Sequence, residues 1–263
     1  MFRFILLSVI LLSLKTAHAS SLFGSVEAVT GDATLSRPTG AAEPVTAGMN
    51  VMAGDSIQTA ANGEVQIVTL DRGFIAIRPD SRLRIDNYHA SDAPDDSEIL
   101  TLFNGAIRSI TGWLGKSNPA GYLLHTPTAT IGIRGTDHET MVLEHATDQD
   151  QPGVYDTVYE GATYMQTEEG ELSLHQGQHA FAPAGSRALP RLLMQTPGFL
   201  KNRRLLLEAH IQQRKDALHR EIAAHLQERD ARKRQEEHRP PEIRRRKLED
   251  RRDNMMRRRQ LEH

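Results

Sequence analysis

Short runs that alternate between apolar and polar residues fill the chain from Gly24 to about Ala184, and turn residues separate them. Alternation at period two is typical of half-buried strands, and almost no helical period interrupts it. Turn signals recur about every 8–12 residues, a spacing typical of antiparallel sandwiches and barrels. We therefore predict a mainly β domain, an all-β sandwich or roll, over residues 20–190.

Three turns in this region carry specific signals. Asn62-Gly63 precedes the clean alternation of residues 64–70, and both residues accept the positive φ of a primed turn, so we predict a tight hairpin there. Asp71-Arg72-Gly73 predicts a second turn. At Gly54-Asp55 the glycine supplies a permissive φ and the aspartate can bond back to the backbone, which gives both a structural role.

The stretch from Thr126 to Thr136 reads Thr-Pro-Thr-Ala-Thr-Ile-Gly-Ile-Arg-Gly-Thr. Its alternation predicts a strand, and Gly132 and Gly135 predict a bend or a close backbone approach, because they have no Cβ. Arg134 lies between these glycines, with a charge where a packed turn is expected.

Two interpretations of Arg134 remain open. In the favoured one its guanidinium stabilises the bend by capping carbonyl groups or by pairing with a buried carboxylate such as Asp137 or Asp55, because its five donors have a fixed geometry. In the other it binds an anionic ligand. Arg108 is interpreted in the same way.

The first 19 residues predict an export signal. Arg3 precedes the apolar run from Phe4 to Leu14, and Ala17-His18-Ala19 has the small-x-small form of a cleavage site. The run is too short to span a bilayer, although an uncleaved anchor is the alternative because Lys15 lies late in the segment. In a Gram-negative cell this signal predicts the periplasm, where a chain without cysteine must fold without disulfides.

Residues 191–263 differ in kind, because they are basic and helical whereas residues 20–190 are acidic. An apolar stripe at helical spacing predicts an amphipathic helix that packs on another surface, and its members are Leu207, Ile211, Leu218 and Ile222. Residues 199–226 are therefore candidates for self-association or docking, and we expect partial disorder after about residue 230. Basic runs at 244–247 and 257–259 would suggest nucleic acid in a cytosolic protein, but export argues against that partner.

Four segments together carry a family resemblance. They are Gly54 to Thr59, Asp71 to Gly73, the Asn-Gly-Ala-Ile-Arg run at 104–108, and the Ala-Thr-Ile-Gly-Ile-Arg-Gly-Thr-Asp run at 129–137. Their order resembles the FecR domain over about residues 24–184, and the last segment is the most specific. Within them, the residues with an expected structural role are Gly54, Asp55, Gly132, Gly135 and Thr136.

The resemblance implies an all-β periplasmic module. The best-known members of that family are transmembrane regulators, with a cytoplasmic segment that controls a sigma factor and a periplasmic part that senses an outer-membrane transporter. Here an export signal stands in place of the cytoplasmic segment. We therefore expect a sensor-type β domain that binds a periplasmic or outer-membrane protein, or an envelope ligand, in signalling or envelope regulation.

The sequence does not favour catalysis or metal binding. Ser56 enters an alternating strand, unlike a nucleophilic serine at a strand-to-helix turn, and Asp86 to His89 follows too closely to supply its base. His175 and His179 have the i, i+4 spacing of a metal-binding pair on a helix, but they lie in a strand-and-turn context broken by Gly177, and neither they nor His138 and His145 have an evident third ligand. The acidic loop 91–98 does not match the spacing of a calcium loop. We predict no enzyme activity, no metal and no cofactor.

An alternative function is a carbohydrate- or envelope-polymer-binding module. Trp113, Tyr122 and Tyr88 are the aromatic residues that would stack on sugars, although core packing is the favoured interpretation. The candidate binding residues are therefore Arg134, Trp113 and Tyr122.

Overall fold

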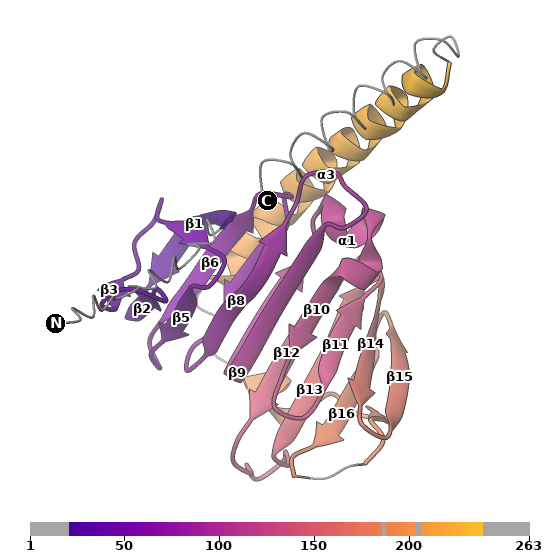
Figure 1. The fold of residues 1–263 in the computed structure, drawn as a ribbon. Coiled ribbons are helices and arrows are strands. Elements are labelled where there is room, and N and C mark those ends of the chain that lie inside the picture. The colour runs from indigo at the N-terminus through magenta and orange to yellow at the C-terminus, as the bar shows by residue number, and fades with distance from the viewer. Residues whose placement is uncertain (1–20, 186–187, 203–206, 239–263) are drawn as a thin grey trace, which may run out of the picture.

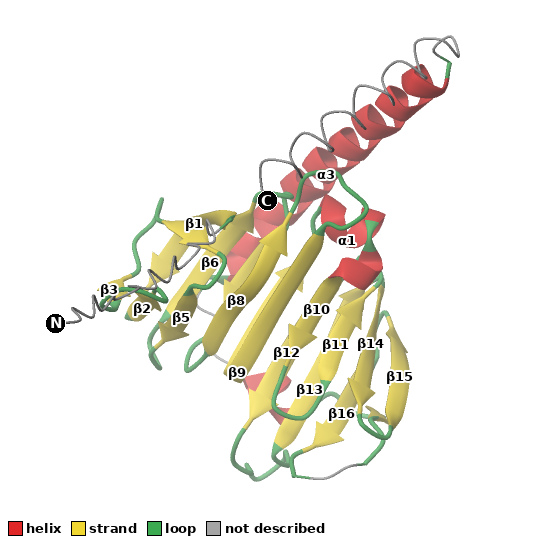
Figure 2. Ribbon diagram, in the orientation of Figure 1, coloured by secondary structure: helices red, strands yellow, loops and turns green. Residues whose placement is uncertain are grey.

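The computed structural model describes residues 21–185, 188–202 and 207–238 (Figure 1). The predicted signal at 1–19 and the basic runs at 244–247 and 257–259 lie outside these residues. Figure 2 shows that strands make up most of the regular structure and that a long helix, α3 (Glu208–Glu237), follows them. The predicted fold class, mainly β with a charged C-terminal helix, is confirmed.

The strands form two connected sheets. In spatial order, the first sheet consists of β4 (Asn50–Met52), β1 (Leu22–Thr30), β6 (Glu64–Thr69), β7 (Phe74–Ile77), the second half of β9 (Ser97–Ile110), β12 (Asp137–Leu143), β13 (Gly153–Glu160), β16 (His179–Pro183) and β17 (Arg191–Leu193). The second consists of β3 (Glu43–Pro44), β2 (Ala33–Ser36), β5 (Ser56–Thr59), β8 (Arg82–His89), the first half of β9, β10 (Tyr122–His125), β11 (Thr130–Ile133), β14 (Ala162–Thr167) and β15 (Gly170–His175). The β9–β10 pair is parallel and the other pairs are antiparallel.

Strand β9 belongs to both sheets and changes sheet at Gly105. Asn104 still pairs with Arg82 of β8, whereas Gly105 pairs with Val142 of β12. Gly105 has a φ of 77°, and a Cβ there would lie 2.5 Å from the Cα of Ser81. The corner between the sheets therefore requires glycine, since other residues rarely adopt this φ and would overlap the neighbouring backbone.

The inward faces of both sheets share one apolar core. Ile67 and Ile77 of the first sheet and Leu83 and Leu100 of the second are fully buried within it. Alternation along β8 confirms the period-two prediction, since its buried and exposed residues follow one another from Arg82 to Ile85. The core explains how the fold is held without disulfides.

The turn at Asn62-Gly63 is not the predicted hairpin. It joins β5 to β6, which lie in different sheets and do not pair. Gly63 lacks a positive φ and instead permits close packing, because a Cβ there would lie 2.2 Å from the carbonyl oxygen of Asp32. Asn62 donates to the Asp32 carboxylate at 3.1 Å, so two corner turns are bound together. The hairpin prediction is wrong because the glycine is needed for contact rather than for φ.

The turn at Asp71-Arg72-Gly73 does form a hairpin, between β6 and β7. The buried Asp71 side chain accepts a hydrogen bond from the Tyr88 hydroxyl at 3.0 Å and one from the backbone of Leu114 at 3.3 Å. Burial raises the pKa of Asp71, and these hydrogen bonds oppose the shift. The hairpin thereby holds the start of α1 (Trp113–Ser117), which the short helix η1 (Pro119–Gly121) follows.

The first half of α3 lies on the outer face of the first sheet, and Figure 1 shows the rest extending beyond the strands. Ile211 and Leu218 are fully buried there, as is Ile222. The partners of Ile211 and Leu218 in this second apolar cluster are Phe74, Ala76 and Ile110. The predicted apolar stripe is confirmed at Ile211, Leu218 and Ile222, whereas Leu207 lies before α3 and is half-buried. The feature that suggested self-association through residues 199–226 is thus occupied within the chain.

Replacing Leu218 by alanine is expected to destabilise the protein by about 2–4 kcal/mol, because it empties a buried leucine site between helix and sheet. Chemical denaturation followed by circular dichroism measures the change. Leu70→Ala is the matched control, since Leu70 is 45% exposed and should change stability by less than about 1 kcal/mol. Equal effects of the two substitutions would contradict the docking of α3.

Candidate functional site

Buried charges lie between α3 and the sheet, beginning with Arg78. Its side chain is 4% exposed, and its guanidinium lies 3.2 Å from Glu64 and 3.6 Å from Glu139. Glu208, at the start of α3, approaches the same guanidinium at 2.9 Å. Arg78 therefore connects a carboxylate of α3 with two carboxylates of the sheet.

Arg108 on β9 forms the second half of this network. Its Nε and Nη2 each lie 2.9 Å from an oxygen of Asp137, which is a two-pronged pair of fixed geometry. Its Nη1 donates to Glu208, and the ring of Tyr159 lies 4.5 Å from the guanidinium carbon. Glu208 therefore joins Arg78 and Arg108, and we call these residues with their partners the Arg78–Arg108 network.

Lys215 extends the network along the next turn of α3. Its Nζ lies 2.7 Å from Asp137 and 2.6 Å from Glu160. Burial alone would raise the pKa of Asp137. Hydrogen bonds and charges from Arg108 and Lys215 outweigh this effect and hold the pKa below its usual value. Each charged group of the network thus has an opposite charge within the chain, although Arg78 Nε has no hydrogen-bond partner among the described residues. These ion pairs make the network a docking site for α3 rather than a ligand site.

Arg134 does not pair with Asp137 or Asp55, so the expected pairing with a buried carboxylate is wrong. Its side chain is exposed, and Asp137 forms its ion pair with Arg108 instead. Arg134 follows β11 directly, and its backbone N–H donates to Ala162 at 2.8 Å. Together with Lys116 it lines a shallow hollow beside Gly135. The open interpretation, recognition of an anionic ligand, stays a prediction.

The other residues of this block shape the passage from β11 to β12. Gly132 lies under the ring of Tyr164, where a Cβ would come within 2.0 Å of a ring carbon. Gly135 has a φ of 66°, and the Thr136 backbone exchanges hydrogen bonds with Thr111. These contacts give Gly132, Gly135 and Thr136 the structural role that the sequence indicates.

The Gly54-Asp55 turn also has a structural role. Gly54 has a φ of 94°, and the Asp55 carboxylate accepts the backbone N–H of Met52 at 2.9 Å. Burial raises the pKa of Asp55, although the hydrogen bond from Met52 opposes the shift. The geometry is the one that the residue types predict.

The three aromatic residues do not form a sugar-stacking face. Tyr122 and Tyr88 are buried in the core, where their hydroxyls donate to Ser109 and Asp71. The ring of Trp113 stacks on the imidazole of His225 of α3, with a centroid distance of 4.0 Å. The predicted stacking role is wrong for both tyrosines, because a buried ring cannot contact a polymer.

The serine considered on the sequence is not part of a catalytic arrangement within the described ranges. Ser56 lies in the regular strand β5 and shares no hydrogen bond with a histidine there. His138 and Asp156 do pair, at 2.9 Å, with Ser109 opposite His138 on β9, but all three are buried in the core. Since substrate cannot reach them, they form a structural polar cluster.

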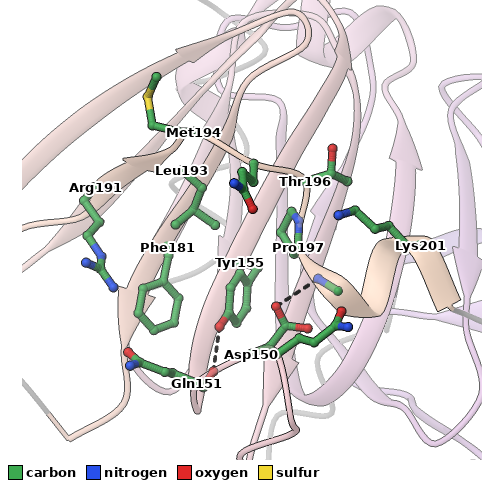
Figure 3. Close-up of a pocket in the computed structure, with 13 residues that line it drawn as sticks. Asp150, Gln151, Tyr155, Phe181, Arg191, Leu193, Met194, Thr196, Pro197 and Lys201 are labelled. Atoms are coloured by element: carbon green, nitrogen blue, oxygen red, sulfur yellow. Dashed lines mark hydrogen bonds between the residues drawn. The ribbon is translucent and has the colours of Figure 1, made fainter.

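A pocket of about 660 Å³ opens at the far end of the first sheet, beside β17 (Figure 3). Tyr155 and Phe181 form its aromatic floor, with ring centroids 4.5 Å apart. Arg191 and Lys201 lie on opposite sides of it, and Met194 projects at the rim. The Arg191 guanidinium lies 5.3 Å from the centre of the Phe181 ring, which supports its position.

The short helix α2 (Gly198–Asn202) closes one wall of the pocket. Asp150 accepts the backbone N–H groups of Gly198 and Phe199 at 2.9 and 2.8 Å, which fixes the start of this helix. Phe199 packs edge-on against Tyr155, with ring centroids 5.1 Å apart. The pocket is therefore built from three parts of the chain and held on a rigid sheet.

Sequence reasoning missed this pocket. Tyr155 and Phe181 occupy the outward positions of predicted strands, where an alternating pattern indicates exposed residues. The available signal was the pair of apolar residues Leu192 and Met194, in a stretch assigned to the start of the charged tail. Their exposure distinguishes them from core residues, and exposure cannot be read from the sequence.

Part of the β sandwich matches a known protein family. Residues 55–162 match the family model described as FecR protein. The chain carries a FecR domain. The match contains the Gly132–Gly135 block, Arg108 and the β9 corner, whereas the pocket combines Tyr155 within the FecR domain with β16, β17 and α2 beyond it.

Two crystal structures of a candidate anti-sigma factor from Parabacteroides distasonis ATCC 8503, at 1.65 and 2.50 Å resolution, resemble the FecR-domain protein. The TM-scores are 0.40 and 0.41, with 13% sequence identity in both. Each alignment covers 52% of this chain and 59% of the solved chain, so less than two thirds of that protein is represented here. No curated protein sequence matches this chain.

Among the described residues, no helix is both long enough and apolar enough to cross a membrane.

Proposed function

We propose that this FecR-domain protein is a non-enzymatic, periplasmic binding protein that acts in signalling, and that it binds an extended segment of a protein partner at β17. The predicted export signal supports the compartment, and the FecR domain supports a signalling role. The observation that carries the binding proposal is the pocket beside the edge strand β17. A pocket next to a strand edge suits a peptide that adds to the sheet.

The edge of β17 is suited to strand addition. Within the described ranges β17 pairs with β16 alone, so its other edge presents backbone donors and acceptors without a strand partner. Leu192 is 43% exposed and Met194 is 97% exposed at this edge. Apolar side chains exposed on an edge strand indicate a contact surface, because an edge without partners usually carries charged residues.

The charges around the pocket favour an acidic partner segment. Arg191 and Lys201 lie at the pocket, whereas its nearest carboxylate, Asp150, is bonded to the start of α2. Arg191 and Lys201 can bind a carboxylate of the segment, while the exposed Leu192 and Met194 offer contacts for its apolar side chains. We therefore propose a segment that combines acidic and apolar residues.

A photocrosslinking amino acid in place of Met194 tests this function in cells that naturally contain the protein. We expect a crosslinked protein adduct, and Arg191→Glu should reduce its yield about tenfold or more by reversing the charge at the pocket. Leu70 is the matched control position, because it is apolar and 45% exposed but lies on the turn between β6 and β7.

Equal adduct yields at positions 70 and 194 would contradict the proposed site. An adduct at position 194 that is insensitive to Arg191→Glu would contradict the acidic segment. Recovery of envelope polysaccharide in place of a protein would instead support the alternative, a polymer-binding module.

A further inference from the structure

Three potential metal ligands converge at the loop between β8 and β9. His89 ends β8, Asp95 and Asp96 directly precede β9, and one ligand atom from each lies within 4.8 Å of the others. The pairing of His89 with Ser97 in adjacent strands fixes this proximity. Sheet register therefore brings the imidazole to the carboxylates, and the sequence spacing of the loop does not reveal it.

Asp96 is the buried member of the group, with 2% of its surface exposed. Its Oδ1 accepts the backbone N–H of Ser91 at 2.9 Å and lies 4.0 Å from Nε2 of His89. Its Oδ2 is also buried and has no hydrogen-bond partner within the described residues. A buried carboxylate oxygen without a donor is costly, and a bound cation is one of the few groups that can compensate it.

The loop is held in place from two sides. The side-chain amide of Asn118, between α1 and η1, donates to the carbonyl oxygens of Asp96 at 2.9 Å and Pro94 at 3.2 Å. Asp92, with a φ of 65°, pairs with His225 of α3 at 3.2 Å. The loop around Asp96 is thus positioned by the fold before any ion binds, which lowers the cost of binding.

We propose that His89, Asp95 and Asp96 form a binding site for a first-row divalent transition metal ion, with Zn²⁺ as the reference ion. One imidazole nitrogen and two carboxylates suit such ions, whereas Ca²⁺ and Mg²⁺ prefer oxygen ligands alone. Ligand atoms bonded at about 2.0–2.2 Å lie roughly 3–3.5 Å apart in a tetrahedral or octahedral shell. His89 and Asp95 are exposed and can close the remaining distance, with water completing the shell.

The metal site would stabilise the contact between this loop and the helices. Because Asp92 and Asn118 connect the loop to α3 and α1, an ion at Asp96 would reduce loop motion where α3 leaves the sheet. This inference goes beyond the proposed function, since the pocket at β17 does not include any of these residues.

Isothermal titration of the purified, tag-free and chelator-treated protein with ZnCl₂, MnCl₂ and CaCl₂ tests the site. We expect one Zn²⁺ per chain, weaker Mn²⁺ binding and no comparable Ca²⁺ binding. The His89→Ala and Asp95→Ala variants should each bind Zn²⁺ at least tenfold more weakly. His145→Ala/Asp148→Ala is the matched control, because it removes an exposed histidine and an exposed aspartate from another loop.

Thermal unfolding gives a second measurement that does not depend on heat of binding. Zn²⁺ at about 100 times its dissociation constant should raise the Tm of the wild type by roughly 5–10 °C, and should not raise that of Asp96→Asn. In the absence of metal, Asp96→Asn should unfold at or above the wild-type temperature, because it removes a buried charge. Absence of Zn²⁺ uptake, undiminished uptake by His89→Ala, or tighter binding of Ca²⁺ than of Zn²⁺ would overturn the proposal.

Discussion

Replacing Arg108 by alanine is expected to destabilise the protein by about 3–5 kcal/mol, because it removes the cation that the buried Asp137 shares with the half-buried Glu208. Each carboxylate is then left with a single cationic partner, Lys215 for Asp137 and Arg78 for Glu208. Arg108→Lys should lie between alanine and wild type, since lysine keeps the charge but cannot form the two-pronged pair. Urea denaturation of the three proteins at low and high salt measures the change. The loss should persist in salt, because the network is shielded from solvent.

Arg134→Ala is the matched control for Arg108→Ala. Both replace an arginine of the FecR domain by alanine, but Arg134 is exposed and should change stability by less than about 0.5 kcal/mol. A stability loss at Arg134 equal to that at Arg108 would show that the buried network does not hold the helix. Loss of partner binding by Arg134→Ala at unchanged stability would instead support Arg134 as a ligand site.

Gly105→Ala is expected to be at least as damaging, with a loss of about 3–5 kcal/mol. The φ of 77° costs an L-residue roughly 1–2 kcal/mol, and the new Cβ would overlap the backbone of Asp80 and Ser81 at 2.5 Å. Since β9 passes from one sheet to the other at this residue, the overlap cannot be relieved without moving both sheets. Thermal unfolding and the yield of soluble protein measure the effect.

Gly48→Ala separates the two causes of this loss. Gly48 has a φ of 83°, close to that of Gly105, but a Cβ there would meet nothing within 4 Å. We expect a loss of about 1–2 kcal/mol from the φ alone. Similar effects at Gly48 and Gly105 would mean that the close contact at the corner is unimportant.

The sequence predicts the strands of this protein better than their partners. Alternation and turn residues are local, so β6, β8 and the helix α3 can be found within a few residues. Pairing is set by contacts far apart in the chain. The turn at Asn62-Gly63 illustrates the difference, because the same dipeptide serves a hairpin or a corner according to which sheet the next strand joins.

The roles of the arginines show a similar limit. Arg134 attracts attention because two glycines flank it, yet it follows the strand and its side chain reaches solvent. Arg108 lies within β9, on the outward face where a charge is unremarkable, and becomes buried only because α3 covers that face. The helical stripe predicts that α3 docks somewhere, but the surface that receives it depends on the assembled sheet. The same reason hides the pocket at β17.

The residues that match the FecR family model are fewer than the residues that must fold together, because strands outside the match pair with strands inside it. A fragment trimmed to residues 55–162 would keep β9. It would lose β1, β2 and β16, which pair with β6, β5 and β13 in the whole protein. Each sheet would then end in strands with bare edges, and those of the first sheet, β6 and β13, are long enough to favour aggregation. Soluble truncated forms should therefore extend from β1 through β16, whatever limits the family match suggests.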